Sequence, residues 1–70
     1  METQEMKNMI SKNLHRLMAH KGLHATALSK VVSISYKKIV EFIEGTATPN
    51  PEQVKLLADA LGADVDEFYK

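Results

Sequence analysis

The chain has 70 residues, of which 44% are hydrophobic and 26% charged, a composition typical of a folded chain rather than a disordered one. This length accommodates one small domain, and the absence of cysteine excludes disulfides and cysteine-ligated zinc sites. No apolar run approaches the roughly 18 residues of a membrane-spanning helix, and the polar start lacks the apolar stretch of a secretory signal. We therefore expect a cytoplasmic domain without a membrane partner.

The zero net charge conceals an asymmetry along the chain. Residues 1–40 carry seven basic and two acidic side chains, a net charge of +5, and residues 41–70 carry two basic and seven acidic ones, a net charge of −5. A basic half favours a polyanionic partner such as nucleic acid, provided that the fold separates the two halves in space. The alternative is that these charges only solvate the surface.

Apolar residues that recur every three or four positions predict three helices in the first 45 residues. The first covers residues 6–20, after a flexible tail over residues 1–5, and a single domain occupies residues 6–70. The second covers residues 25–32. The third covers residues 36–44, with Ser35 as its N-cap and Gly45 at its end. The buried positions expected in these helices are Ile10, Leu14, Leu17, Met18, Leu28, Val31, Val32, Ile39, Phe42 and Ile43.

The fourth helix has the clearest start signal in the chain. Asn50 has the character of an N-cap, Pro51 occupies the first helical position, and Gln53 completes the spacing of a capping box. Gly62 marks the end of this helix. Its apolar stripe consists of Val54, Leu57, Ala58 and Leu61.

A fifth, short helix is predicted where Asp64 and Glu67 repeat the spacing of a capping box. Three apolar side chains, Val65, Phe68 and Tyr69, fall within five residues here, which is more than one short helix can bury beneath itself. We expect them to form a dimerisation surface. The alternative is that Val65 and Phe68 close the core of the monomer.

Residues 25–44 have the spacing of a helix-turn-helix, and residues 57–68 run through Ala-Leu-Gly into an acidic segment. With these features the chain resembles the lambda-repressor/Cro-type family of phage and bacterial regulators. The resemblance implies a compact all-α, five-helix DNA-binding domain. It also implies a sequence-specific transcriptional regulator, of the phage or prophage repressor type, that binds a palindromic operator as a homodimer. The residues that carry the helix-turn-helix spacing are Leu28, Ser29, Ser33, Ile34, Ser35, Ile39 and Phe42.

The match to the family's positions also implies a set of DNA contacts. The N-terminal part of the third helix enters the major groove, where a lysine donates to guanine, a tyrosine packs on a thymine methyl, and a glutamate accepts from cytosine. The alternatives are that the tyrosine packs on the domain, that the lysines are solvated, and that the glutamate only pairs with a lysine. The implied base-reading residues are Tyr36, Lys37 and Glu41, and the implied phosphate contacts are Ser35, Lys38, Thr46 and Thr48.

Three positions depart from the family pattern. Ala25 stands where a glutamine commonly reaches a phosphate, Ser33 stands where the turn is often glycine, and Ile43 replaces a common glutamate. Ala25 and the zero net charge favour a second hypothesis. In that hypothesis the domain is a protein-interaction module on the same fold, such as an antitoxin or a regulator whose main contact is a protein partner.

Other chemistry finds no support in the sequence. His15, His20 and His24 lack companion ligands for a metal site, and we interpret them as surface residues. The chain contains neither a nucleophile elbow nor a phosphate-binding loop. We therefore expect neither a cofactor nor an enzyme activity.

Overall fold

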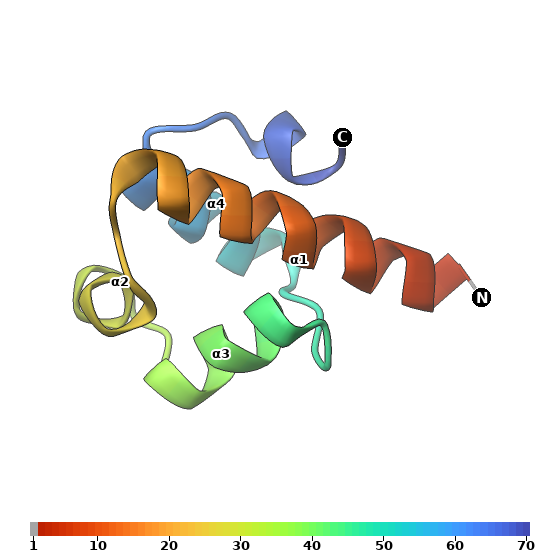
Figure 1. Ribbon diagram of the computed structural model, residues 1–70, viewed down its shortest axis with the longest axis horizontal. Coiled ribbons are helices and arrows are strands. Elements are labelled where there is room, and N and C mark those ends of the chain that lie inside the picture. Colours follow the sequence, from red (N-terminus) through yellow and green to blue (C-terminus); the bar gives the residue numbers. More distant parts are fainter. Residues whose placement is uncertain (1) are drawn as a thin grey trace.

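The computed structural model describes the backbone of residues 2–70 and the side chains of residues 5–70. The elements are α1 (Glu2–Lys21), α2 (Ala25–Val31), α3 (Tyr36–Glu44), α4 (Pro51–Leu61) and a short 3-10 helix, η1 (Val65–Phe68) (Figure 1). No strand occurs among the described residues, so the all-α prediction is confirmed there. The prediction of five helices is wrong in one respect, because the last element is a single 3-10 turn.

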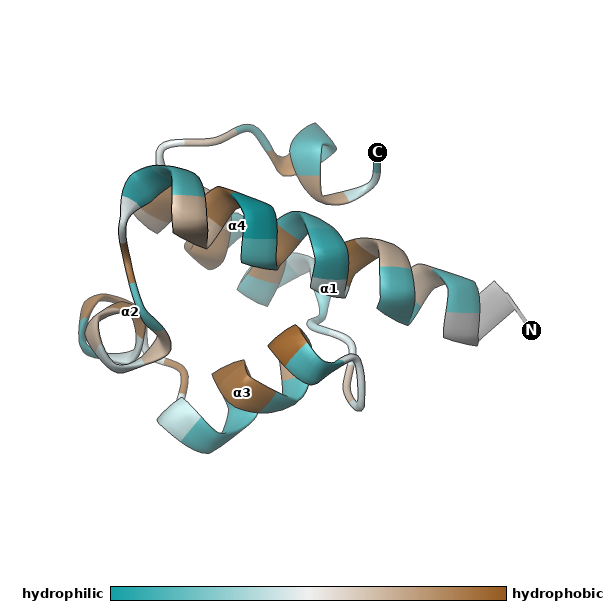
Figure 2. Ribbon diagram, viewed as in Figure 1, coloured by the Kyte–Doolittle hydropathy of each residue, from teal (hydrophilic) through white to brown (hydrophobic). Residues whose placement is uncertain are grey.

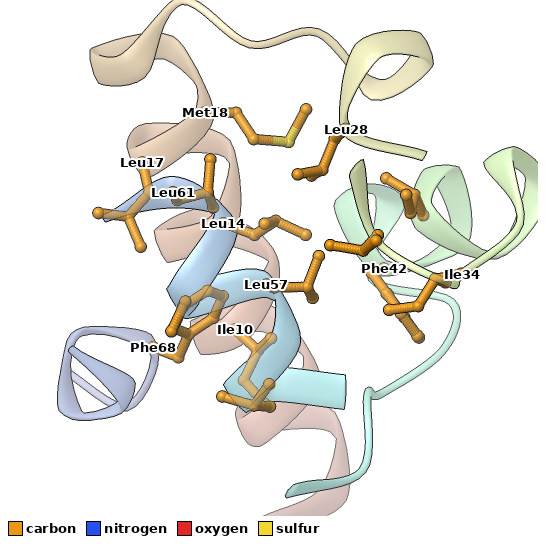
Figure 3. Close-up of a cluster of buried hydrophobic side chains, with 14 residues drawn as sticks. Ile10, Leu14, Leu17, Met18, Leu28, Ile34, Phe42, Leu57, Leu61 and Phe68 are labelled. Atoms are coloured by element: carbon orange, nitrogen blue, oxygen red, sulfur yellow. The ribbon is translucent and has the colours of Figure 1, made fainter. Parts of the chain in front are cut away.

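α1 is the element around which the others are arranged (Figure 1). α3 lies on one side of α1 and η1 lies on the other, while α2 packs against α3 and η1 packs against both α1 and α4. Fourteen buried apolar side chains from these helices and from the turn after α2 form one cluster between them (Figure 3). The domain bounds proposed from the sequence, residues 6–70, stay a prediction.

α1 begins earlier than its apolar pattern predicts. It starts at Glu2 instead of residue 6, so the helix extends through most of the segment expected to be a flexible tail. The chain has no proline or glycine before Gly22 to interrupt a helix, and an acidic side chain such as Glu5 near the N-terminal end complements the helix dipole. Met1, which also belongs to the predicted tail, lies outside the described residues.

α4 begins as predicted. Asn50 Oδ1 accepts the backbone N–H of Gln53 at 2.7 Å, and Gln53 Oε1 accepts the backbone N–H of Asn50 at 3.0 Å, which completes the capping box. The helix ends at Leu61, and Gly62 follows in the left-handed conformation with φ of 65°. The predicted stripe of four apolar residues is buried. Local sequence signals therefore define both ends of this helix.

The second predicted capping box does not form. The Asp64 side chain makes no capping hydrogen bond, and the Glu67 carboxylate lies 3.5 Å from Arg16 Nη2 instead. The backbone N–H of Glu67 donates to the carbonyl of Asp64, and that of Tyr69 donates to the carbonyl of Asp66, both at 3.0 Å. These bonds span three residues, which is the spacing of a 3-10 helix. The backbone N–H of Glu67, which the Asp64 side chain was predicted to cap, thus bonds to the backbone instead, and the Glu67 carboxylate lies toward α1.

Phe68 closes the core of the monomer. Its side chain is fully buried and points into the cluster between α1 and α4 (Figure 3), and its carbonyl accepts a hydrogen bond from Asn13 Nδ2 at 3.0 Å. The prediction that Phe68 lies on a dimerisation surface is therefore wrong, because a side chain without exposed area cannot contact a second copy. Val65 and Tyr69 remain 39% and 40% exposed on either side of it.

Candidate nucleic-acid interface

The turn between α2 and α3 is fixed by two apolar side chains. Val32 leaves the helix in an extended conformation and is buried, as is Ile34. Val31, the last residue of α2, is 64% exposed, so the prediction that it is buried is wrong. The helix ends one residue earlier than predicted, and the extended backbone turns Val32 inward in its place. Ser33 requires no glycine-like backbone, since no described non-glycine residue has a positive φ.

α3 covers the predicted residues and presents two distinct faces. Ile39 and Phe42 are almost completely buried and attach the helix to the core. Figure 2 shows the hydrophobic residues of α3 on the side toward α1 and hydrophilic ones on the other side. Ser35 is the N-cap, as predicted, and its Oγ accepts the backbone N–H of Lys38 at 3.3 Å. Since Oγ only accepts in this bond, its hydrogen is available to donate to an external group.

The outer face of α3 begins with three consecutive exposed side chains, Tyr36, Lys37 and Lys38. Tyr36 is 54% exposed, which does not fit the alternative in which its ring packs on the domain. The predicted base-reading residues Tyr36 and Lys37 thus stand together at the N-terminal end of α3, beside the cap residue Ser35. This end of a second helix is the part that a helix-turn-helix inserts into the major groove.

Glu41, the third predicted base-reading residue, is partly buried and pairs with Lys38. Its Oε1 lies 3.4 Å from Lys38 Nζ, three residues earlier on the same helix. A pair of this kind at a protein surface contributes about 0–1 kcal/mol, so a stronger partner for either side chain replaces it readily. The alternative in which Glu41 pairs with a lysine is therefore observed. The role of Glu41 in base reading stays a prediction.

The two threonines after α3 direct their hydroxyls inward. The backbone N–H and the Oγ1 of Thr46 both donate to the carbonyl of Glu41, at 3.0 and 3.3 Å, which closes the C-terminal end of the helix. The Oγ1 of Thr48 is buried and makes no hydrogen bond among the described residues. The buried hydroxyl of Thr48 does not reach a phosphate in this conformation, so the predicted contact would rest on its backbone amide and stays a prediction. A phosphate contact by the Thr46 hydroxyl requires it to leave Glu41.

The acidic end of the chain lies away from α3. η1, whose first turn contains Asp66 and Glu67, is on the opposite side of α1 from the recognition helix (Figure 1). Arg16 belongs to that side, since it pairs with Glu67 and also lies 3.4 Å from the Asn13 side-chain oxygen. The fold thus separates the acidic residues of η1 from the exposed lysines of α3, although Glu41 and Glu44 of the acidic half belong to α3 itself.

His15, His20 and His24 are exposed, and no group of three potential ligands within residues 5–70 is arranged to hold a metal ion. None of the described helices is long and apolar enough to cross a membrane.

Comparison with known families shows whether this helical domain belongs to a known family. A family model described as the Cro/C1-type HTH DNA-binding domain matches residues 13–70, which is most of the chain. The chain belongs to this Cro/C1-type family. Searches of curated proteins and of solved structures returned no match.

The sequence pattern did not indicate two polar side chains of α1 that bind other elements. The Ser11 hydroxyl donates to the carbonyl of Ile43 in α3, and the Asn13 amide donates to the carbonyl of Phe68 in η1. Both lie beside the apolar stripe of α1, where a polar residue ordinarily indicates the edge of the exposed face. Their partners are 32 and 55 residues away in sequence, so no local signal marks them.

Proposed function

We propose that this Cro/C1-type domain is a sequence-specific transcriptional regulator, of the phage or prophage repressor type, that binds a palindromic operator as a homodimer. The observation that carries the proposal is the division of α3 into two faces. Ile39 and Phe42 are buried in the core, while Tyr36 and Lys37 project outward at the end that enters the major groove. The protein would act in the cytoplasm, associated with the nucleoid when bound.

The exposed residues of α3 and its N-cap would make two kinds of contact, with base edges and with phosphates. Lys37 would donate to guanine O6 and N7, and Tyr36 would pack on a thymine methyl or donate from its hydroxyl. Glu41 would accept from cytosine N4 once its pairing with Lys38 is released. Ser35 and Lys38 would contact phosphates, with the exposed N-terminal N–H groups of α3 in support.

The exposed apolar residues of the C-terminal segment support a dimer. Val65 and Tyr69 flank the buried Phe68 and leave a small apolar surface on η1. One such domain contacts only a few base pairs, and a dimer doubles that contact. Two recognition helices on one face of the duplex require half-sites about 34–36 Å apart.

A protein-interaction module on the same fold remains the second candidate. It is favoured by the hydroxyls of Thr46 and Thr48, because the first donates to the Glu41 carbonyl and the second is buried, so neither is directed at a phosphate. Mobility shifts on random duplex DNA across a series of salt concentrations distinguish the two. Retardation that falls steeply with salt supports the DNA-binding regulator. An unshifted duplex at low salt supports the interaction module, whose contact is a protein partner.

The Lys38→Ala variant tests the phosphate contact within the same salt series. We expect the slope of log K against log salt to lose about 0.9, the share of one phosphate contact, with all DNA sequences weakened alike. Lys70→Ala is the matched control, since it removes the same charge from an exposed residue at the C-terminal end of the chain. A slope that is unchanged in Lys38→Ala, or reduced equally in both variants, would assign Lys38 to the solvated face.

Analytical ultracentrifugation tests the dimer. We expect the free protein to sediment as a dimer at high micromolar concentration, and Tyr69→Asp to yield monomers by placing a charge in the apolar contact. Leu56→Asp is the control, because Leu56 has a similar exposure of 38% but lies on α4, outside the C-terminal segment of residues 65–69. A wild-type monomer that binds with one protein per DNA site contradicts the dimer, and dissociation by Leu56→Asp alone moves the interface to α4.

A further inference from the structure

The C-terminal end of α3 is completed partly by another helix. A helix leaves its last four carbonyls without partners in the helix itself. In α3, the carbonyls of Glu41 and Phe42 accept N–H groups from Gly45 and the loop that follows. The carbonyl of Ile43 instead accepts the hydroxyl of Ser11, which belongs to α1.

The backbone around this hydrogen bond packs closely against α1. Gly45, the C-cap of α3, has φ of 79°, and a Cβ placed on it would lie 3.7 Å from both Asn8 Oδ1 and Ser11 Cβ. These are ordinary contact distances, so glycine is required here by its backbone angle and not by lack of space. The Ser11 side chain is partly buried at this contact, which reduces the competition from water for the Ile43 carbonyl.

α1 makes the same kind of bond on its other side. Asn13 donates to the carbonyl of Phe68, and it is separated from Ser11 by two positions, or about 200° around the helix. This angle agrees with the placement of α3 and η1 on opposite sides of α1 (Figure 1). Two polar residues of α1 therefore donate hydrogen bonds to carbonyls at the C-terminal ends of α3 and η1.

The Ser11 bond supplies a constraint that the core does not. Ile39 and Phe42 seat α3 in the core by close packing, and the Ser11 bond adds a directional contact near the C-terminal end of the helix. A hydrogen bond is directional, and this one is seven residues from Tyr36, or about 10 Å along the helix. A tilt of about 10° at the Ser11 end therefore displaces the Tyr36 end by about 2 Å, which is enough to break a base contact.

We propose that Ser11 is a positioning residue that sets the angle at which α3 presents Tyr36 and Lys37 to DNA. This inference rests on the proposed function, since it assigns Ser11 a part in base reading. Phosphate contacts tolerate a small displacement because they carry no sequence information, whereas base contacts do not. Loss of the Ser11 hydroxyl should therefore weaken binding to the preferred site selectively.

The test compares Ser11→Ala, Ser11→Thr and Ser29→Ala with the wild type on two duplexes, a site selected from a random pool and a random sequence. Ser29→Ala is the matched control, because its hydroxyl also donates to a backbone carbonyl, that of Thr26 at 2.8 Å, but within α2. We expect Ser11→Ala to lose about fivefold in affinity for the selected site. We expect it to stay within about twofold of the wild type on random DNA. Ser11→Thr keeps a hydroxyl and should restore the selected-site affinity.

Binding is measured where circular dichroism shows each variant to be folded, so unfolding does not imitate the effect. Residual dipolar couplings of the free proteins give the angle between α1 and α3 independently of DNA. A changed angle in Ser11→Ala that Ser11→Thr reverses supports the proposal. An unchanged angle, or equal losses on both duplexes, overturns it. If the wild type binds no DNA, the proposed function fails, while the couplings still decide whether Ser11 orients α3.

Discussion

Phe68→Ala is expected to lower the free energy of unfolding by about 3–5 kcal/mol, the usual loss when a buried phenylalanine is truncated. The side chain is fully buried between α1 and α4, so its removal leaves a cavity that the short η1 is poorly able to fill. A domain of this size has a total stability of about 4–10 kcal/mol, so the loss takes a large share of it. Urea unfolding followed by circular dichroism at fixed protein concentration measures the effect.

Tyr69→Ala is the control for this measurement. Its side chain is 40% exposed, and we expect a change of about 0.5–1 kcal/mol at most. A larger loss for Tyr69→Ala than for Phe68→Ala would mean that η1 is turned the other way, with Phe68 outward. The comparison therefore tests whether Phe68 belongs to the core or to an exposed surface, and it does so without requiring that a dimer exist.

Tyr36→Ala and Lys37→Ala are each expected to weaken binding to the preferred DNA site by about 1–3 kcal/mol, with a smaller loss on random DNA. Both side chains are exposed on the outer face of α3, so neither substitution should disturb the core. The preferred site is obtained by selection from a random pool with the wild-type protein. Fluorescence anisotropy at one salt concentration then gives both affinities.

Lys37→Arg provides the control for base reading. Arginine retains the charge and donates two hydrogen bonds to guanine, so this variant should keep most of the preference for the selected site. Equal losses on selected and random DNA in Lys37→Ala would show that this side chain positions the protein without reading the sequence. The same comparison for Tyr36→Ala decides whether its ring contacts a base.

The sequence predicted those elements whose ends are encoded locally. α3 covers the expected residues because Ser35 caps its start and Gly45 adopts the left-handed conformation at its end. α4 follows from the capping box of Asn50 and Gln53 in the same way. In each case the signal lies within a few residues of the element that it defines, so no knowledge of the tertiary structure is needed.

The capping box and the exposed position of Phe68 were predicted wrongly for the C-terminal segment, because contacts with residues distant in sequence determine its conformation. Glu67 has the spacing of a capping partner for Asp64, but Arg16 pairs with it, and Asn13 holds the carbonyl of Phe68. In a four-residue turn the complete burial of Phe68 and the bond from Asn13 outweigh the local pattern. The direction of Phe68 therefore depended on contacts that only the folded chain creates.

The residues of the candidate interface also differ in how far the sequence predicts them. The exposure of Tyr36 and Lys37 follows from the helical period once Ile39 and Phe42 are assigned to the core. The hydroxyl of Thr46 instead caps the helix that precedes it, a local competition between side chain and backbone that residue type alone does not resolve.

The separation of the two faces of α3 also bears on how such a protein changes its target. Positions 36 and 37 contribute little to the core, so their side chains are exchangeable at small expense in stability. Ile39 and Phe42 hold α3 against the core when the residues at those two positions are substituted. Under the proposed function, substitutions at a few outward positions would change the DNA sequence that is bound, and a descendant protein could diverge in recognition while its scaffold stays the same.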